Sequence, residues 1–279
     1  MAKVETQTIE VNNHILSFYP NAHRYKLDEK WITSCTTAIS PCFDKSAPMM
    51  YWAVEQTLLQ VTNGLDKLTE AGIEFKAENY KEIFKFAKDE HKRQKEEAGV
   101  IGTDIHDVIQ GFAEGKGVTV RDKEIRIING AAGFLRWAYT HNFRPLTSEE
   151  LIFSVKLQVA GMLDTTALID LPEEGLRDVL ILGDWKTANG VYDSHIVQVA
   201  GYYLMKQEMY PDFKVDRFFI MRFDKLTGEF QAVDITPYIE SAMIIFRKCV
   251  EQFRWMKDVN LYLKGFNDVA KQERKELYD

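Results

Sequence analysis

Two stretches, 161-GMLDTTALID-170 and 178-DVLILGDWKT-187, decide how this 279-residue chain folds. Both contain apolar runs of branched residues bounded by glycine, proline or acidic residues, which is typical of strands. We expect strands over 162–169 and 179–182, and a turn at 172–175, where proline, two glutamates and glycine follow one another. The two strands are therefore expected to lie in one sheet.

Three polar residues of these strands are expected to meet. Asp164 lies near the start of the first strand, while Asp184 and Lys186 lie at the end of the second. Because side chains alternate along a strand, Asp184 and Lys186 point the same way and Trp185 points to the other face. Carboxylates are hard oxygen ligands for Mg²⁺ or Mn²⁺. A nearby lysine can orient a water molecule or neutralise charge on a phosphoryl group.

Two amphipathic helices flank this pair of strands in the sequence. A helix expected over 102–114 carries His106 one turn from its start. A second helix, expected from residue 193, carries Gln198 and Tyr202, which are four residues apart and therefore share a face. A lone histidine on a helix is usually a packed or surface residue, and a buried tyrosine is often ordinary helix packing.

In this order the segments resemble the PD-(D/E)xK nuclease superfamily, specifically its RecB-like branch, which includes phage exonucleases. The branch is marked by Gly-x-x-x-His, Gly-x-x-Asp, Asp-x-Lys-Thr and Gln-x-x-x-Tyr, which stand here at 102–106, 161–164, 184–187 and 198–202. The combination is specific, although each member alone is weak. Asp28-Glu29-Lys30 is a second Asp-x-Lys triplet, in a charged stretch typical of a hairpin turn. Leu163 replaces the name-giving proline, which has no catalytic atoms to offer.

The resemblance implies an α/β fold in which helices flank a central mixed β-sheet, a restriction-endonuclease-like core, with an N-terminal hairpin and a helical insertion. It implies a metal-dependent deoxyribonuclease, most simply an exonuclease acting in DNA processing, recombination or repair. The implied catalytic residues are Asp164, Asp184, Lys186, Gln198 and Tyr202, and the implied ligands of Mg²⁺ or Mn²⁺ are His106, Asp164, Asp184 and the backbone carbonyl of Trp185. Lys186 would position the attacking water, and Gln198 and Tyr202 would orient Lys186 or contact the DNA backbone.

Other interpretations of the same residues stay open. The aspartates and Lys186 could form a purely structural salt-bridge cluster, and the fold could hold DNA or a partner protein without cutting it. A small-molecule phosphohydrolase is a weaker alternative, because the sequence contains no glycine-rich phosphate loop and no second His/Asp cluster. Glu150 matches the acidic residue that often opens the strand pair in relatives, and Thr187 could contact phosphate.

Composition limits the function classes. The net charge of −7 argues against binding to nucleic acid by bulk electrostatics, but it allows a local basic groove. Three scattered cysteines cannot build a disulfide framework or a four-cysteine iron–sulfur cluster. With no apolar leader and no run long enough to span a membrane, we expect a cytoplasmic protein, in the host cytoplasm if phage-encoded. Its expected partners are DNA and a protein of recombination or replication.

The remaining chain is expected to form one nuclease domain over 1–279, with an N-terminal hairpin and helical part (1–97), a catalytic core (98–257) and a polar tail (258–279). We expect a β-meander over 14–34, strands over 151–156, 158–163, 217–223 and 229–233, and helices over 49–61, 79–97, 123–142 and 236–257. Ala98-Gly99 is expected to separate the helix over 79–97 from the one that begins at Gly102. The apolar stripe expected for the helix over 123–142 consists of Ile125, Ile128, Ala132, Leu135 and Tyr139.

Overall fold

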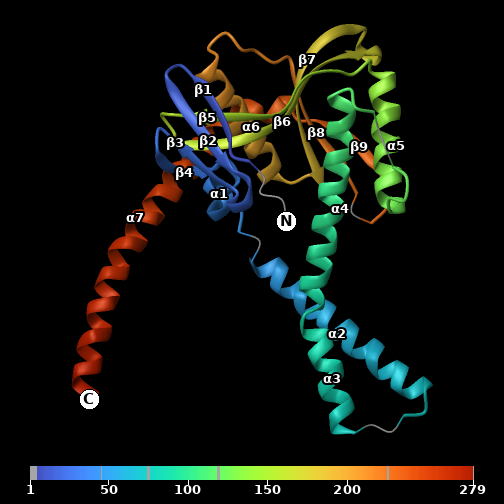
Figure 1. Cartoon of the computed structure of the whole chain (residues 1–279), viewed down its shortest axis with the longest axis vertical. Helices are drawn as coiled ribbons and strands as arrows, with labels where there is room; N and C mark the ends of the chain where they lie inside the picture. Colours follow the sequence, from blue (N-terminus) through green and yellow to red (C-terminus); the bar gives the residue numbers. More distant parts are fainter. Residues whose placement is uncertain (1–4, 45, 74–75, 118–119, 225, 279) are drawn as a thin grey trace.

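The computed structural model describes residues 5–44, 46–73, 76–117, 120–224 and 226–278, with side chains for all of these except 77–79 and 269–278. It is an α/β protein with one large mixed sheet flanked by helices, and two helical arms extend from this body (Figure 1). Among the described residues, none of the helices combines the length and the apolar character that crossing a bilayer requires.

Nine strands form the sheet within the described residues. They are β1 (Gln7–Val11), β2 (His14–Tyr19), β3 (Arg24–Leu27), β4 (Lys30–Ser34), β5 (Arg144–Ser154), β6 (Val159–Leu171), β7 (Leu176–Thr187), β8 (Arg217–Phe223) and β9 (Phe230–Asp234). Their order is β1-β2-β3-β4-β6-β7-β8-β9, and β5 also pairs with β6. The expected meander over 14–34 is confirmed, and it gains β1 as a fourth strand.

The centre of the sheet follows the expected strands. β5, β6 and β7 form an antiparallel meander, and β8 pairs in parallel with β7. The turn between β6 and β7 is a 3₁₀ turn, η3 (Pro172–Glu174), closed by Gly175 at a φ of 67°. The meander of β1–β4 joins this sheet because β4 pairs in parallel with β6, with Thr33 beside Val159 and Ser34 beside Ala160.

Helices cover both faces of the sheet. One core lies between the sheet and α1 (Cys35–Ile39), α6 (Asp193–Met209) and the start of α7 (Ile239–Tyr278), with Leu163, Leu182 and Phe246 fully buried in it. A second core lies under α4 (Glu90–Ala113) and α5 (Ile125–Thr140), and it contains Phe134 and Trp185. Short 3₁₀ turns η1 (Pro20–Ala22), η2 (Ser40–Cys42) and η4 (Thr236–Tyr238) complete the connections.

The expected break at Ala98-Gly99 is wrong. α4 runs without interruption through Gly99 and Gly102, and the expected boundary between 97 and 98 falls inside it. The break lies at Asp89, between α3 (Ala77–Lys88) and α4. A glycine inside a helix costs only about 1 kcal/mol relative to alanine, so the packing of α4 on its neighbours outweighs it.

The expected apolar stripe of α5 is also wrong, although the helix itself is confirmed. The buried face consists of Ile127, Gly130, Ala131, Phe134 and Ala138, while Ile125 is exposed and Tyr139 is 90% exposed. Glycine explains this choice, since a Cβ on Gly130 or Gly133 would meet the ring of Phe223 or the Cβ of Phe230. The small residues let α5 approach β8 and β9 more closely than the expected face would allow.

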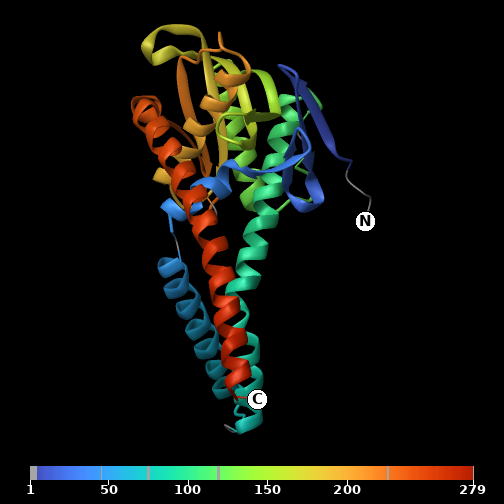
Figure 2. The same cartoon turned by 90° about the vertical axis from the view of Figure 1, so that its left-hand side faces the viewer.

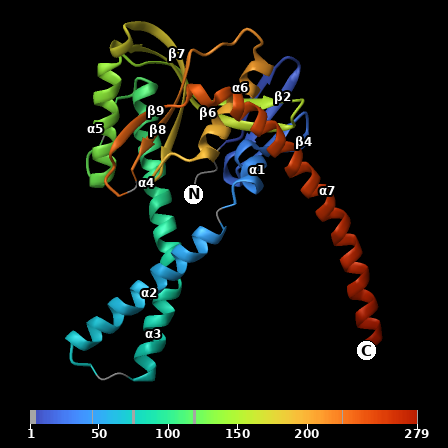
Figure 3. The ribbon, with the colours of Figure 1, turned by 180° about the vertical axis from the view of Figure 1, so that it is seen from behind.

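Two helical arms extend from the body. One consists of α2 (Ser46–Glu70), α3 and the first half of α4, and the other is the distal half of α7 (Figures 1 and 2). The expected helix over 236–257 therefore continues through the expected tail as far as Tyr278. Figure 3 shows the two arms diverging when the molecule is seen from behind.

Candidate active site

The three polar residues of the central strands meet as expected. Asp164 on β6 accepts a hydrogen bond of 2.7 Å at Oδ2 from the backbone N–H of Trp185 on β7. The Nζ of Lys186 lies 2.6 Å from Oδ2 of Asp184, so these two side chains share a face. Trp185 points into the opposite core. The register explains why the aspartates meet. Thr165 pairs with Gly183, and because the strands are antiparallel, Asp164 and Asp184 occupy the next position of the pair, one on each strand.

Burial sets the electrostatics of this group. Asp184 is fully buried, which raises its pKa to about 7 although the positive charge of Lys186 opposes the change. Burial likewise raises the pKa of Asp164, opposed by Lys186 and by the hydrogen bond from Trp185. Burial by itself lowers the pKa of Lys186, but the two carboxylates outweigh it and the pKa is raised. We therefore expect Lys186 to be charged and unsuited to act as a free base.

His106 on α4 lies beside this group. Burial lowers the pKa of its imidazole, and the charge of Lys186 lowers it further, while Asp184 and the backbone of Trp185 act in the opposite direction. A depressed pKa keeps the ring neutral, which is the form that binds a metal ion. His106 therefore lies near Asp184 and the backbone of Trp185.

Glycines hold the motif segments against one another. A Cβ on Gly161 of β6 would lie 2.7 Å from Cε1 of Tyr202 on α6, and a Cβ on Gly102 of α4 would contact Thr187 at the end of β7. The hydroxyl of Tyr202 accepts a hydrogen bond of 2.6 Å from Nε2 of Gln198. Gln198 and Tyr202 are both buried, so this hydrogen bond lies inside the protein.

Cys35 is a member of the site environment that the sequence did not indicate. It opens α1 directly after β4, it is buried, and its Sγ donates a weak hydrogen bond of 3.7 Å to the backbone carbonyl of Gln198. Burial raises the pKa of this thiol, and the charge of Asp184 raises it further. The thiol is therefore protonated, and it acts as a packing residue at the floor of the site.

Two acidic residues stand next to each other at the start of the strand pair. Glu150 is partly exposed and forms an ion pair with the buried Lys206 of α6. Its neighbour Glu149 is exposed and has a left-handed backbone with a φ of 49°, and its negative charge makes a minor contribution that raises the pKa of Asp164. Burial and the negative charge of Asp107 raise the pKa of Glu149.

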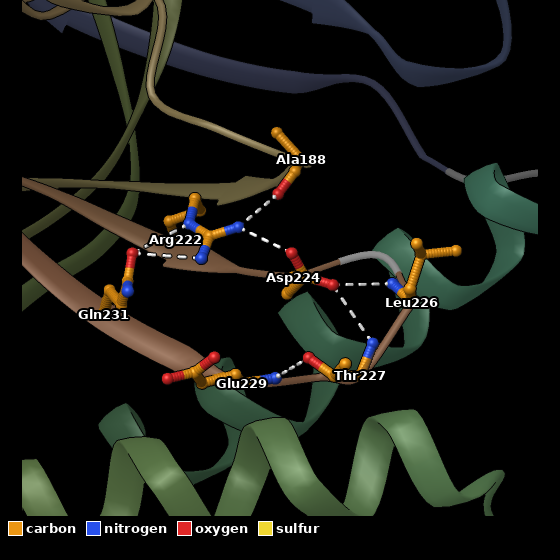
Figure 4. A network of polar contacts seen from close by, with 7 residues as sticks. All are labelled: Ala188, Arg222, Asp224, Leu226, Thr227, Glu229 and Gln231. Carbon is orange, nitrogen blue, oxygen red and sulfur yellow. Dashed lines mark hydrogen bonds and ion pairs between the residues drawn. The ribbon is translucent and has the colours of Figure 1, made fainter.

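A buried arginine fixes the strand end that carries Lys186. Arg222 of β8 stands beside Lys186 of β7 in the parallel register. Its Nη1 donates to the carbonyl of Ala188 at 3.1 Å and to Oδ2 of Asp224 at 2.8 Å, and its Nε and Nη2 donate to Oε1 of Gln231 (Figure 4). Ala188 also donates its N–H to the carbonyl of Phe223 at 3.0 Å. The network joins the residue after the Asp-x-Lys-Thr segment to the neighbouring strand.

Asp224 connects this network to the turn between β8 and β9. Its Oδ1 accepts the backbone N–H groups of Leu226 and Thr227 at 2.9 and 3.1 Å (Figure 4). Burial alone would raise its pKa, but the hydrogen bonds from Arg222 and the two N–H groups lower the pKa of Asp224 to about 2. The turn closes with Gly228, where a Cβ would lie 2.0 Å from the carbonyl oxygen of Arg126 on α5.

The site contains carboxylates, which are of the type that binds a hard divalent ion, but they are not arranged around one in this structure. Neither oxygen of Asp184 has a hydrogen bond of good geometry among the described residues, although Oδ2 forms the ion pair with Lys186. Within that same part of the chain, no group of three or more His, Cys, Asp or Glu side chains is close enough together to hold a metal ion. Asp184 would therefore have to exchange Lys186 for an ion, and Asp164 has one oxygen committed to the backbone of Trp185.

No family model matches this chain, and a comparison with curated proteins gives no match either.

Proposed function

We propose that this protein is a divalent-metal-dependent DNA nuclease, most simply an exonuclease, and that β5–β8 with α4 and α6 form its restriction-endonuclease-like core. The observation that carries the proposal is the convergence of Asp164, Asp184 and Lys186 at one buried place on two antiparallel strands. Oδ1 of Asp184 has no partner among the described residues, and a buried unpaired carboxylate oxygen costs folding free energy, so a function accounts for it better than stability does.

The chain's own residues would divide the work as follows. Asp164, Asp184, the ring of His106 and the carbonyl of Trp185 would hold Mg²⁺ or Mn²⁺. A bound ion of this kind polarises the phosphate and lowers the pKa of a bound water molecule. Once released from Asp184, the Lys186 ammonium would orient the attacking water and stabilise negative charge on the phosphoryl oxygens. Gln198 and Tyr202 would keep the strand end and α6 in register beneath Lys186.

The test is cleavage of end-labelled linear and circular DNA, single- and double-stranded, with Mg²⁺ or Mn²⁺. The Lys186→Ala protein should lose cleavage by a factor of about 10²–10⁴ while remaining folded. Lys30→Ala provides a matched control, because Lys30 ends the other Asp-x-Lys triplet and is exposed on β4. Cutting of linear but not circular DNA would identify an exonuclease. Equal cutting by the Lys186→Ala and wild-type proteins would contradict the proposed site.

A non-catalytic binding module is the second candidate, and the ion pair favours it. Asp184 and Lys186 neutralise each other at 2.6 Å, as a purely structural cluster would. Such a module should bind DNA without cutting it, with either metal present. Isothermal calorimetry with Mn²⁺ separates the two candidates. For a binding module, wild type and Asp184→Asn should give the same heat of Mn²⁺ binding, whereas for a nuclease the Asp184→Asn protein should lose the heat that wild type shows.

A further inference from the structure

The two arms of this protein each carry an apolar face that the described residues of the same chain leave uncovered. On α2, whose 25 residues are all described, no residue is buried, and Met50, Tyr51, Val54, Leu58 and Leu59 are exposed. Tyr51, Val54 and Leu58 follow one another at spacings of three and four, so they form a stripe along one side of the helix. The opposite side of α2 is half-buried against α3 and α4.

The distal half of α7 repeats this arrangement. Trp255, Val259, Tyr262 and Phe266 are spaced by four, three and four, which is the spacing of a seam between two helices. Trp255, Tyr262 and Phe266 are each about two-thirds exposed or more, and every residue over 260–268 is exposed. Large contiguous apolar faces of this kind mark protein–protein contacts.

The α7 face cannot reach the α2 face of its own chain. Ile239, Phe246 and Val250 bury the first turns of α7 in the core, and Arg254 donates a hydrogen bond to the carbonyl of Leu157 on the body. From there α7 continues as one helix that diverges from α2 (Figures 1 and 3). Closing the gap would require a break in α7 at the point where the body holds it.

We propose that a second copy of this chain covers both faces, with α7 of each copy packed on α2 of the other. Reciprocal contacts about a twofold axis satisfy all four faces at once. The net charges of the two surfaces are opposite in sign, since α2 contains three acidic residues and one basic residue, whereas residues 255–278 of α7 contain five basic and four acidic residues. The proposal does not depend on the proposed function.

The area available agrees with a stable dimer. An aromatic side chain buries 150–250 Å² in full, so the three exposed aromatic residues of α7 alone offer about 400 Å². With the leucines of α7 and the stripe of α2, each copy offers on the order of 1,000 Å². Two copies would then bury roughly 2,000 Å², which lies at the lower end of obligate homodimers.

The experiment measures molar mass in solution by light scattering and sedimentation over a range of concentrations. We expect the wild-type protein to have about twice the chain mass of 32.3 kDa. Leu58→Asp on α2 and Tyr262→Asp on α7 should each raise the dissociation constant at least tenfold, because each places a charge in the contact. The matched control is Tyr139→Asp on α5, where the side chain is 90% exposed outside both faces, and it should leave the dissociation constant unchanged.

Mixing the two variants tests the pairing itself. A copy with Leu58→Asp retains a normal α7, and a copy with Tyr262→Asp retains a normal α2, so their heterodimer keeps one intact contact. A second charge costs little more in a contact that a first charge has already broken, so this heterodimer should be tighter than either variant homodimer. A wild-type protein that is monomeric at every concentration, a defined assembly larger than two copies, or a mixture no tighter than the separate variants would each overturn the proposal.

Discussion

Replacement of Gly161 by alanine tests the contact that joins β6 to α6. The new Cβ would lie 2.7 Å from Cε1 of Tyr202, closer than real Cβ contacts come. Neither partner can yield easily, since Gly161 is paired with Ile152 in the interior of the sheet and the buried Tyr202 is hydrogen-bonded to Gln198. Overpacking of this kind costs about 1–3 kcal/mol, and the lower entropy of the unfolded alanine chain returns less than about 1 kcal/mol.

We therefore expect Gly161→Ala to lower the free energy of unfolding by about 2 kcal/mol, which corresponds to a fall in Tm of roughly 4–8 °C for a chain of this size. The measurement is urea and thermal unfolding followed by both circular dichroism and tryptophan fluorescence. Gly99→Ala is the control, because a Cβ there contacts nothing within 4 Å in the middle of α4, and it should stabilise by up to about 1 kcal/mol. A Gly161→Ala protein as stable as wild type would refute the reasoning, and so would equal losses in both variants.

Three further changes probe the network beside the site. In urea unfolding, Arg222→Met should lower the free energy of unfolding by about 3 kcal/mol or more, because it leaves buried acceptors unpaired. Arg222→Lys should lie between Arg222→Met and wild type, and an Arg222→Met protein as stable as wild type would contradict this prediction. Because the pKa of Asp224 is lowered to about 2, its stabilisation is present above about pH 4 and is lost as the pH falls through 2. Wild type should exceed Asp224→Asn in free energy of unfolding by about 1 kcal/mol after allowance for partial exposure, and this difference should shrink between about pH 4 and pH 2. A difference that stays constant over this pH range would contradict the role given to Asp224. Gly228→Ala should lower the free energy of unfolding by at least about 2 kcal/mol, since the new Cβ would collide with the α5 backbone at a residue whose φ is already 75°. Gly115→Ala, with a φ of 71° and open space around it, should lower it by only about 1 kcal/mol. Thermal unfolding of both variants measures the difference, and equal losses would show that the collision has no effect.

The sequence predicted the strands of the central sheet and the shared face of Asp184 and Lys186. Strand periodicity places Asp184 and Lys186 on one face and Trp185 on the other, and only a register is then needed to bring Asp164 opposite. The turn over 172–175 leaves Leu171 opposite Leu176, and a bulge between Ile169 and Leu171 then shifts the pairing by one residue, which brings Asp164 to the level of Asp184. Periodicity and turn residues predict the two strands and the turn, but they do not reveal this bulge.

The failures concern choices that only tertiary packing makes. Gly99 and Gly102 have the local signature of a break, but α4 remains helical because it packs on other elements along its length. Residues Ile125 and Tyr139 fit a helical stripe as well as Ile127 and Phe134 do, and the close approach of β8 and β9 decides between the two faces. Period and propensity give equal weight to such alternatives, so the sequence alone could not separate them.

The motif spacings gain a packing explanation beside the chemical one. The glycine of Gly-x-x-Asp leaves room for the tyrosine of Gln-x-x-x-Tyr, and the glycine of Gly-x-x-x-His lies against the threonine of Asp-x-Lys-Thr. The aspartate of Gly-x-x-Asp in turn accepts a hydrogen bond from the backbone of Asp-x-Lys-Thr. Each segment thus contacts at least one other segment, and no segment completes its contacts alone. A single segment therefore brings none of these contacts by itself, and the four segments form them only in combination.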